Sequence, residues 1–431
     1  MNSENEISLS LARREFMKTG LLASFSLPTL LNYSALAGPT PKVTAKHKTL
    51  VIIQLDGGND GLNTVVPWGN SRYYRARENI AIKEADVLKF TGVKAAEGLG
   101  VHPQMEYFTE LFQEGKLAVI NNVGYAQPNR SHFKSGAIWE SGLDGAAMAS
   151  EDQIRNSSGW IGRYFDKHCG GESNLVGAYY GDSPLAMRGQ AFTGTSISDL
   201  QSQPFGFMKL GEDMALHPAF RKMQEAAKNA DESSGEKLSF VRNVAAETQT
   251  STDQMRKFLA DVKQRGGDFP RTKLGKQLGM ISELIINGGD TRVYQARIGG
   301  FDTHSGQAAK HARLWKEIND ALRAFIGRMK STGLDNDVAV MTYSEFGRQL
   351  KENGTGGTDH GAAAPVFIIG GGVKGAIYGK PPTLKGDQVN NYGGLAYEID
   401  FRSVYKSILE EYLKVDTIGI ISDKYPALKL F

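Results

Sequence analysis

The chain has 431 residues, of which 50 are lysine or arginine and 47 are aspartate or glutamate, so the formal net charge is only +3. This near balance excludes a strongly basic nucleic-acid-binding surface, and we expect no nucleic-acid partner. The single cysteine, Cys169, excludes an intramolecular disulfide framework and a multi-cysteine metal site. Any metal ligands are therefore histidines, carboxylates or hydroxyls.

Residues 1–37 have the features of an export signal. Arg13 and Arg14 precede an apolar stretch from 21 to 36, and a small-x-small cleavage motif ends at Ala37. The arginine pair resembles the signal of the twin-arginine route, which exports folded proteins. We expect a periplasmic or extracellular mature chain, with the twin-arginine export machinery as a partner. The stretch is too short and too polar to span a membrane well, so no stable membrane insertion is expected after cleavage.

Residues 38–431 are expected to form a single α/β domain. Short apolar, β-branched runs predict buried strands, and they alternate with segments of helical periodicity. This succession favours a mostly parallel central sheet with helices on both faces, where a ligand binds beyond the carboxyl ends of the strands. The expected strands are 49–55, 117–121, 292–298, 337–342 and 365–369, and the expected helices include 102–115 and 131–140.

The stretch from about 207 to 290 differs from its surroundings because it is polar and helical, with a charged, serine-rich passage at 225–237. We interpret it as a helical insertion between strands of the sheet. Two roles fit this pattern, a cap over the site or a cover for one face of the sheet.

Polar side chains gather at the ends of the predicted strands. Asp56 follows the first strand, Asp302 and His304 follow the strand ending at 298, Glu345 follows the strand ending at 342, and His360 precedes the last strand. In a parallel sheet such loops converge on one edge. Carboxylate and imidazole ligands suit Zn²⁺, Mn²⁺ or Mg²⁺, which would polarise a phosphoryl or sulfuryl oxygen. Each residue also has a simpler interpretation, as a turn cap or an ordinary hydrogen-bonded histidine.

The order of these motifs resembles the alkaline phosphatase-like superfamily, which includes phosphatases, sulfatases and cofactor-independent phosphoglycerate mutases. A closer resemblance, from about residue 48 to the C-terminus, is to the twin-arginine-exported proteins known as the domain of unknown function 1501 family. Six ordered motifs carry it: QLDGGNDGLNTVVP (54–67), PNRSHF (128–133), GWIGRYFD (159–166), GFDTH (300–304), SEFGR (344–348) and GTDHG (357–361).

The superfamily resemblance implies an alkaline phosphatase-like fold and a set of metal ligands. Phe346 stands where the superfamily carries the histidine of an Asp-His-Gly motif, so one of its two metal sites lacks a ligand here. The ligands implied are Asp56, Asp302, His304, His360 and, in place of the motif's aspartate, Glu345.

The resemblance also points to a candidate nucleophile. Ala126 stands where sulfatases carry a modified cysteine, which argues against a formylglycine mechanism. Ser131, at a helix start, is the better hydroxyl, although it also fits a plain N-cap. Arg130 would form a bidentate pair with an anionic ester, and Arg348 would either do the same or form a structural ion pair.

Two functions follow as hypotheses from the sequence. The first is an exported, metal-dependent hydrolase of phosphate or sulfate esters, in which Ser131 and Arg130 act on the anionic ester substrate beside the metal. The alternative is a non-catalytic binding protein of the cell envelope or exterior, which retains a degenerate alkaline phosphatase-like site.

Overall fold

The computed structural model describes residues 47–144, 150–169, 176–190, 192, 194–197, 268–287 and 291–431. The expected export signal lies outside the described residues, as does most of the expected insertion, namely residues 207–267. Among the helices that are described, none combines the length and apolar character needed to cross a bilayer.

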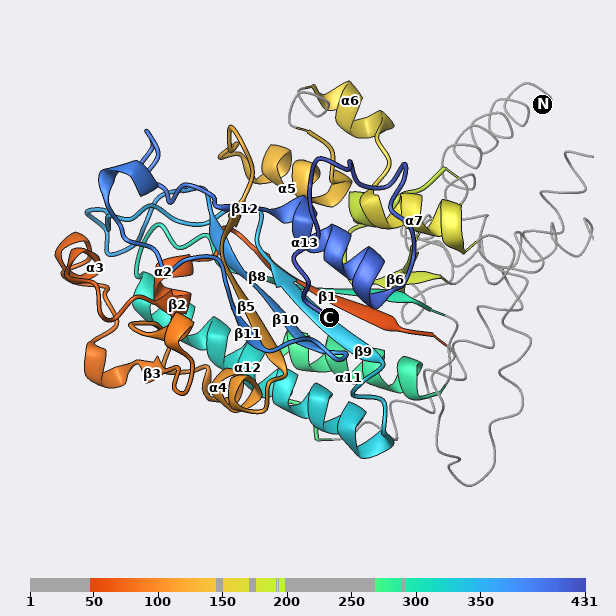
Figure 1. The fold of residues 1–431 in the computed structure, drawn as a ribbon, viewed down its shortest axis with the longest axis horizontal. Helices are drawn as coiled ribbons and strands as arrows, with labels where there is room; N and C mark the ends of the chain where they lie inside the picture. Colours follow the sequence, from red (N-terminus) through yellow and green to blue (C-terminus); the bar gives the residue numbers. More distant parts are fainter. Residues whose placement is uncertain are drawn as a thin grey trace, which may run out of the picture.

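A nine-stranded sheet forms the centre of the described part of the chain (Figure 1). Its strands are β1 (Thr49–Asp56), β5 (Leu117–Gly124), β6 (Gly177–Tyr179), β7 (Thr195–Ser196), β8 (Val293–Gly299), β9 (Val338–Tyr343), β10 (Ala364–Gly370), β11 (Ala376–Tyr378) and β12 (Ile399–Asp400). They follow the order β11-β5-β10-β9-β1-β8-β6-β7, with β12 also paired to β5. The predicted mostly parallel sheet is confirmed, with β10 as the one strand antiparallel to its neighbours.

Strand β1 lies in the middle of this sheet because its sequence is apolar on both sides. Side chains alternate between the two faces of a strand. Val51, Ile53 and Leu55 accordingly belong to one hydrophobic core, and Leu50 and Ile52 belong to the other. The strand is therefore covered on both faces.

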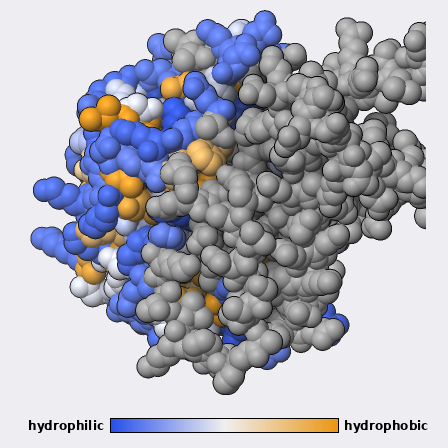
Figure 2. Space-filling model, turned by 90° about the vertical axis from the view of Figure 1, so that its right-hand side faces the viewer, coloured by the Kyte–Doolittle hydropathy of each residue, from blue (hydrophilic) through white to orange (hydrophobic). Residues whose placement is uncertain are grey.

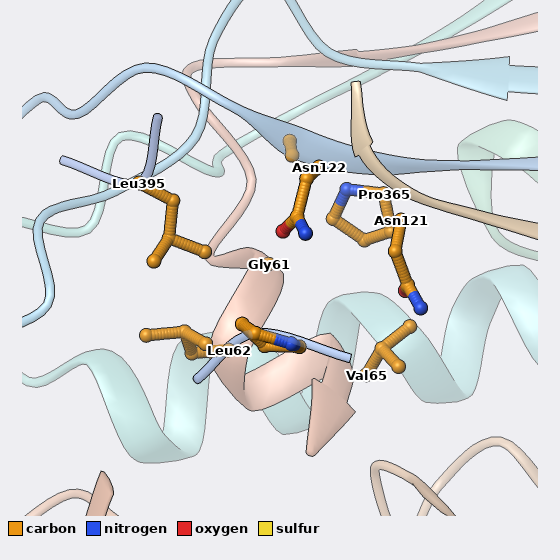
Figure 3. Close-up of a pocket in the computed structure, with 9 residues that line it drawn as sticks. Gly61, Leu62, Val65, Asn121, Asn122, Pro365 and Leu395 are labelled. Atoms are coloured by element: carbon orange, nitrogen blue, oxygen red, sulfur yellow. The ribbon is translucent and has the colours of Figure 1, made fainter. Parts of the chain in front are cut away.

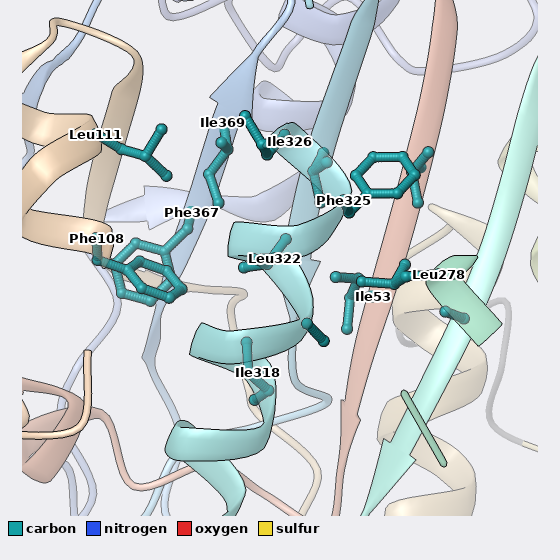
Figure 4. Close-up of a cluster of buried hydrophobic side chains, with 14 of the residues drawn as sticks. Ile53, Phe108, Leu111, Leu278, Ile318, Leu322, Phe325, Ile326, Phe367 and Ile369 are labelled. Carbon is teal, nitrogen blue, oxygen red and sulfur yellow. The ribbon is translucent and has the colours of Figure 1, made fainter. Parts of the chain in front are cut away.

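Within the described part of the chain, three helices cover the first face of the sheet: α4 (Glu106–Gln113), α11 (Lys273–Ile286) and α12 (Gln307–Thr332). Ile318, Leu322 and Phe325 of α12 project towards the strands, as Figure 4 shows. Helix α11 is the described part of the expected insertion, and it packs against α12 on this face.

The second face is covered by α5 (His132–Ser141), α7 (Trp160–His168) and α13 (Phe401–Ser407), which continues into the π-helical turn η8 (Ile408–Tyr412). Aromatic rings fill this layer: Trp160 stacks on Tyr405 at 4.3 Å between centroids, and Trp139 stacks on Phe401 at 4.4 Å. The expected arrangement with helices on both faces is thus confirmed.

Smaller elements make up the rest of the secondary structure in the described residues. A three-stranded sheet has the order β2-β4-β3. On the face shown in Figure 2, the described surface is mostly hydrophilic, with separate hydrophobic patches. The remaining elements are β2 (Val65–Val66), β3 (Leu88–Lys89), β4 (Gly100–Val101), α2 (Gly61–Thr64), α3 (Ser71–Ala76), α6 (Glu151–Asn156), η2 (Glu84–Asp86), η3 (Lys94–Ala96), η5 (Leu185–Met187) and η7 (Gly386–Gln388).

The reversed direction of β10 decides where its preceding loop lies. The amino end of an antiparallel strand meets the carboxyl ends of its neighbours. The loop before β10, which carries His360, therefore reaches the same edge of the sheet as the loops after β1, β8 and β9. In a fully parallel sheet that loop would lie at the opposite edge.

Candidate metal centre

The turn after β1 is built to let the neighbouring loop approach closely. Gly57 has φ +119°, and a Cβ there would lie 2.3 Å from the backbone nitrogen of Asp302. Only glycine fits such a conformation without strain and such a contact without displacement. The backbone nitrogen of Phe301 donates to the carbonyl of Asp56 at 3.2 Å. These contacts hold the 300–304 loop against the end of β1.

Two histidines face the carboxylate of Asp302. The Nε2 atoms of His304 and His360 each lie 3.1 Å from Asp302 Oδ1, and they lie 3.0 Å from one another. Burial would raise the pKa of Asp302, but the hydrogen bond from Arg348 and the positive charge of its guanidinium outweigh burial and lower it to about 2. The carboxylate is therefore ionised at neutral pH.

The second nitrogen of each ring shows which nitrogen carries the proton. His360 Nδ1 lies 2.9 Å from the carbonyl oxygen of Arg130, and His304 Nδ1 lies 2.9 Å from a carboxylate oxygen of Asp359. Both oxygens are acceptors, so each Nδ1 donates a hydrogen. In the neutral rings, both Nε2 atoms then present lone pairs to Asp302. A carbonyl or carboxylate behind the ring is the usual way in which a metal-binding histidine is oriented.

His132, the first residue of α5, is a member of this cluster that the sequence analysis did not select. Its Nδ1 lies 2.6 Å from Oε1 of Glu345, so it too donates to a carboxylate. Its buried Nε2 has no hydrogen-bond partner among the described residues and lies 3.7 Å from Asp302 Oδ2. The hydrogen bond to Glu345 raises the pKa of His132, against the effect of burial.

Glu345 is held as the partner of His132. Its side chain is buried, and besides His132 it accepts hydrogen bonds from the backbone of Gly57 at 3.0 Å and from the Ser344 hydroxyl at 3.2 Å. The carboxylate predicted to be a ligand thus lies behind the imidazole. The following residue, Phe346, forms a wall of the site, with its ring centroid 4.9 Å from that of His132 and 4.7 Å from that of His360.

The donor set fits a divalent cation. One potential ligand atom from each of His132, Asp302 and His360 lies within 4.8 Å of the others, and Nε2 of His304 adjoins two of them. Lone pairs on two imidazoles and an anionic carboxylate repel one another unless a proton or a cation lies between them. Imidazole and carboxylate together are typical ligands of zinc.

Asp56 has a different partner. Its carboxylate lies 2.9 Å from the guanidinium of Arg297 on β8. Asp56 is paired in register with Gly299, so Arg297, two residues earlier, projects from the same face of the sheet. Asp56 is not a member of the group formed by His132, Asp302 and His360.

Arg348 has a structural role, one of the two alternatives that its sequence position allowed. Its guanidinium is fully buried and donates to four backbone carbonyls and to Asp302, the last at 2.7 Å. These carbonyls belong to Gly57, Gly58, Phe301 and Thr358. A buried guanidinium with this many acceptors fixes three loops and is not available to an ester.

Arg130 and Ser131 lie exposed at the beginning of α5. The Arg130 guanidinium stacks over the Tyr392 ring, 4.4 Å from its centroid. Ser131 is the N-cap of α5, and its hydroxyl accepts a long hydrogen bond of 3.5 Å from the Lys134 backbone. Both residues immediately precede His132.

A small cavity lies apart from the histidine cluster (Figure 3). Its volume of about 10 Å³ corresponds to roughly one water molecule, too little for a substrate. None of the histidines and carboxylates described above lines it. Its walls are formed by Gly61, Leu62, Val65, Asn121, Asn122, Ala364, Pro365, Pro382 and Leu395.

The family model described as "protein of unknown function (DUF1501)" matches residues 47–395, whereas no curated protein matches the sequence. Among solved structures, a protein in the alkaline phosphatase superfamily from Vibrio parahaemolyticus matches with a TM-score of 0.32 and 12% identity, over 81% of this chain and 66% of that one. The integral membrane protein lipooligosaccharide phosphoethanolamine transferase A from Neisseria meningitidis matches with a TM-score of 0.32 and 10% identity, over 98% of this chain and 63% of that one.

A sulfatase from Pseudoalteromonas sp. matches with a TM-score of 0.33 and 11% identity, over 99% of this chain and 73% of that one. The chain therefore spans slightly less than two thirds of the Vibrio and Neisseria proteins. Likenesses with TM-scores this low carry no argument about activity.

Proposed function

The chain belongs to the DUF1501 family of proteins of unknown function, and from that premise we propose that it is an exported, divalent-metal-dependent hydrolase of phosphate or sulfate esters. One observation carries the proposal. The histidines His132, His304 and His360 each donate from Nδ1 to an oxygen, which leaves Nε2 of each ring directed towards the Asp302 carboxylate. A cluster of ordinary surface histidines has no reason to share this arrangement.

His132, Asp302 and His360 would hold the ion, with His304 beside them. When bound, a divalent ion supplies positive charge that polarises a phosphoryl or sulfuryl oxygen. Zinc or manganese suits two imidazoles and a carboxylate better than magnesium, which prefers oxygen ligands and water.

The residues before α5 would act on the ester. Arg130 is exposed and carries a planar cation that matches the oxygens of a phosphate or sulfate group. The Ser131 hydroxyl is the proposed nucleophile: its oxygen would bond to the phosphorus or sulfur as the bond from that atom to the ester oxygen breaks, and the hydroxyl proton would leave with the departing alcohol. Water would then hydrolyse the serine ester and release phosphate or sulfate. The positive end of α5 would favour the negative charge of the anionic group. His132 follows directly, so nucleophile and ion-binding side chain are held by the same helix turn.

The experiment that tests this proposal is metal analysis of the purified chain, followed by turnover of a generic aryl phosphate and an aryl sulfate with Zn²⁺, Mn²⁺ or Mg²⁺. We expect about one equivalent of bound metal and turnover that a chelator abolishes. Bound metal without turnover of either ester would favour the alternative, a binding protein with a degenerate site. Absence of binding with every metal supplied would contradict the metal centre itself.

Export is the second part of the proposal, and it is supported by the sequence of residues 1–37. Replacing both Arg13 and Arg14 by lysine keeps the charge but removes the guanidinium pair. We expect the mature chain to disappear from the periplasmic or culture fraction and the precursor to accumulate inside the cell. Normal export and cleavage of this double variant would contradict the twin-arginine route.

A further inference from the structure

Two loops carry Asp302, His304 and His360, and besides Arg348 a second buried side chain connects these loops. Gln307 is the first residue of α12, and its Oε1 accepts hydrogen bonds from the hydroxyls of Thr303 at 3.0 Å and Thr358 at 2.6 Å. Thr303 lies between the two ligands of the 302–304 loop, and Thr358 lies two residues before His360. A single amide oxygen thus joins both loops.

The other end of the amide is anchored in the interior. Gln307 Nε2 donates to the Asp60 carboxylate, which also forms an ion pair of 2.6 Å with Arg77. Asp60 is in turn fixed as the N-cap of α2 by the backbone of Leu62 at 3.1 Å. The side chains of Asp60 and Arg77 are completely inaccessible to solvent.

The chemistry of the partners sets the orientation of the amide. Burial would raise the pKa of Asp60, but Arg77 outweighs burial and lowers it, so the carboxylate is ionised and accepts only. The amide nitrogen must therefore face Asp60, and the oxygen must face the two hydroxyls. A carboxylate in place of this amide has no donor for Asp60, and an aliphatic side chain has neither donor nor acceptor.

From these contacts we propose that Gln307 is a positioning residue, which sets the distance between the Asp302–His304 loop and the His360 loop and thereby makes the cluster ready for an ion. This inference rests on the proposed metal-dependent function. Asp302 and His304 are exposed, so burial of their own side chains does not fix them, and a buried polar anchor beneath their loop would do so. Partners behind metal ligands typically contribute about 10–100-fold to metal affinity.

The test replaces Gln307 by leucine and by glutamate and measures the dissociation constant for Zn²⁺ by competition with a chromophoric chelator. Both variants should bind about 10–100-fold more weakly. The visible spectrum of the Co²⁺-substituted chain, which reports ligand geometry, should change as well. If either variant does not fold, Thr303→Val and Thr358→Val provide milder versions, since each deletes one hydroxyl and keeps the volume.

Asn319→Leu is the matched control. Asn319 is also a buried amide of α12, but its Oδ1 accepts from the Tyr107 backbone at 2.8 Å, on α4. This control should lose stability, as Gln307→Leu does, while its Zn²⁺ affinity and Co²⁺ spectrum stay those of the unsubstituted chain. Equal affinity and spectrum in Gln307→Leu would overturn the proposal.

Amide hydrogen exchange without metal separates this inference from the proposed function. The backbone nitrogen of Thr358 donates to Thr303 at 3.2 Å, and that of Gln307 donates to Gly356 at 2.9 Å, so both amides report how the two loops are held. We expect faster exchange at both in Gln307→Leu than in Asn319→Leu. If the unsubstituted chain binds no metal, faster exchange supports the positioning role while the metal proposal fails. Unchanged exchange overturns the positioning role in either case.

Discussion

At the scale of single residues, His132 is the sharpest test of the candidate metal centre. Its Nε2 is buried without a hydrogen-bond partner among the described side chains, and its Nδ1 is held by Glu345. We expect His132→Ala to weaken Zn²⁺ binding by more than about 100-fold, because a ligand is lost and not only its support. His168→Ala is the control. His168 is the last residue of α7, and its Nε2 lies 3.0 Å from the carbonyl oxygen of Asp416, so this substitution should leave the Zn²⁺ affinity unchanged. Wild-type affinity in His132→Ala would exclude His132 as a ligand.

Glu345 gives a graded version of the same prediction. Glu345→Gln keeps the shape of the side chain but removes the charge that favours a donating Nδ1 on His132. Zn²⁺ affinity should fall by about 10–100-fold, and the fall should largely disappear when His132 is already alanine. Titrations of the two single variants and the double variant test this. Additive losses would mean that Glu345 binds the ion itself, as the sequence suggested.

Ser131 separates chemistry from metal binding. Ser131→Ala should retain the metal and lose turnover by at least about 100-fold if the hydroxyl attacks the ester, since each ~1.4 kcal/mol of barrier is tenfold in rate. Steady-state rates with an aryl phosphate, next to metal content, decide the matter. A twofold loss would identify Ser131 as the helix cap alone.

At the scale of elements, the turn after β1 limits how closely two loops approach. Gly57→Ala places a Cβ 2.3 Å from the Asp302 nitrogen in a conformation that alanine disfavours. We expect a loss of about 3 kcal/mol or more in the free energy of unfolding, together with weaker Zn²⁺ binding. Gly92 also has a positive φ, of +82°, but no atom lies within 4 Å of a Cβ added there, so Gly92→Ala should cost only about 1 kcal/mol and leave the site intact. Urea denaturation of both variants is the measurement.

The elements also show what the sequence predicts and what it does not. The five expected strands are confirmed within a few residues, because an apolar β-branched run identifies a buried strand. Such a run has no direction, so the reversal of β10 was not predictable from it. The ion pair of Asp56 with Arg297 was not predictable from the sequence either, because it depends on the register between β1 and β8.

The candidate site was predicted in part for a related reason. Strand ends drew attention to Asp302, His304 and His360, and these residues lie together. His132 lies at the start of a helix and not at the end of a strand, so a search of strand ends does not identify it. Its one signal in the sequence is the PNRSHF motif, whose serine and arginine are the residues predicted to be functional.

At the scale of the whole molecule, two buried histidines should make the fold sensitive to acid. Burial lowers the pKa of His102 to about 4, and burial followed by the charge of His102 lowers that of His311 to about 3. Both values lie below the value of about 6.5 in an unfolded chain. Their contribution to stability is therefore complete above pH 6.5 and is lost as the pH falls towards the folded values.

Protonation of each of these two histidines in the unfolded chain should lower the free energy of unfolding by about 1.4 kcal/mol at pH 5.5, relative to its value well above pH 6.5. His132 opposes this trend, because its raised pKa adds stability at low pH. Urea denaturation at pH 7.5, 6.5 and 5.5 should show that the free energy of unfolding falls with the pH. In His311→Gln this fall should be smaller, because about one proton fewer is taken up on unfolding. A dependence identical to that of the unsubstituted chain would mean that His311 is protonated in the folded state.

The place of β1 in the sheet has a consequence for the order of folding. Residues 49–56 pair with 293–299 on one side and 338–343 on the other, so the first strand finds its neighbours only after most of the chain has been synthesised. Contacts between such distant segments require large loops to close first, which slows folding. The histidine cluster joins residues 132, 302 and 360, and it therefore forms late. On the proposed function, an ion would therefore bind at this site only at or after the last stage of folding.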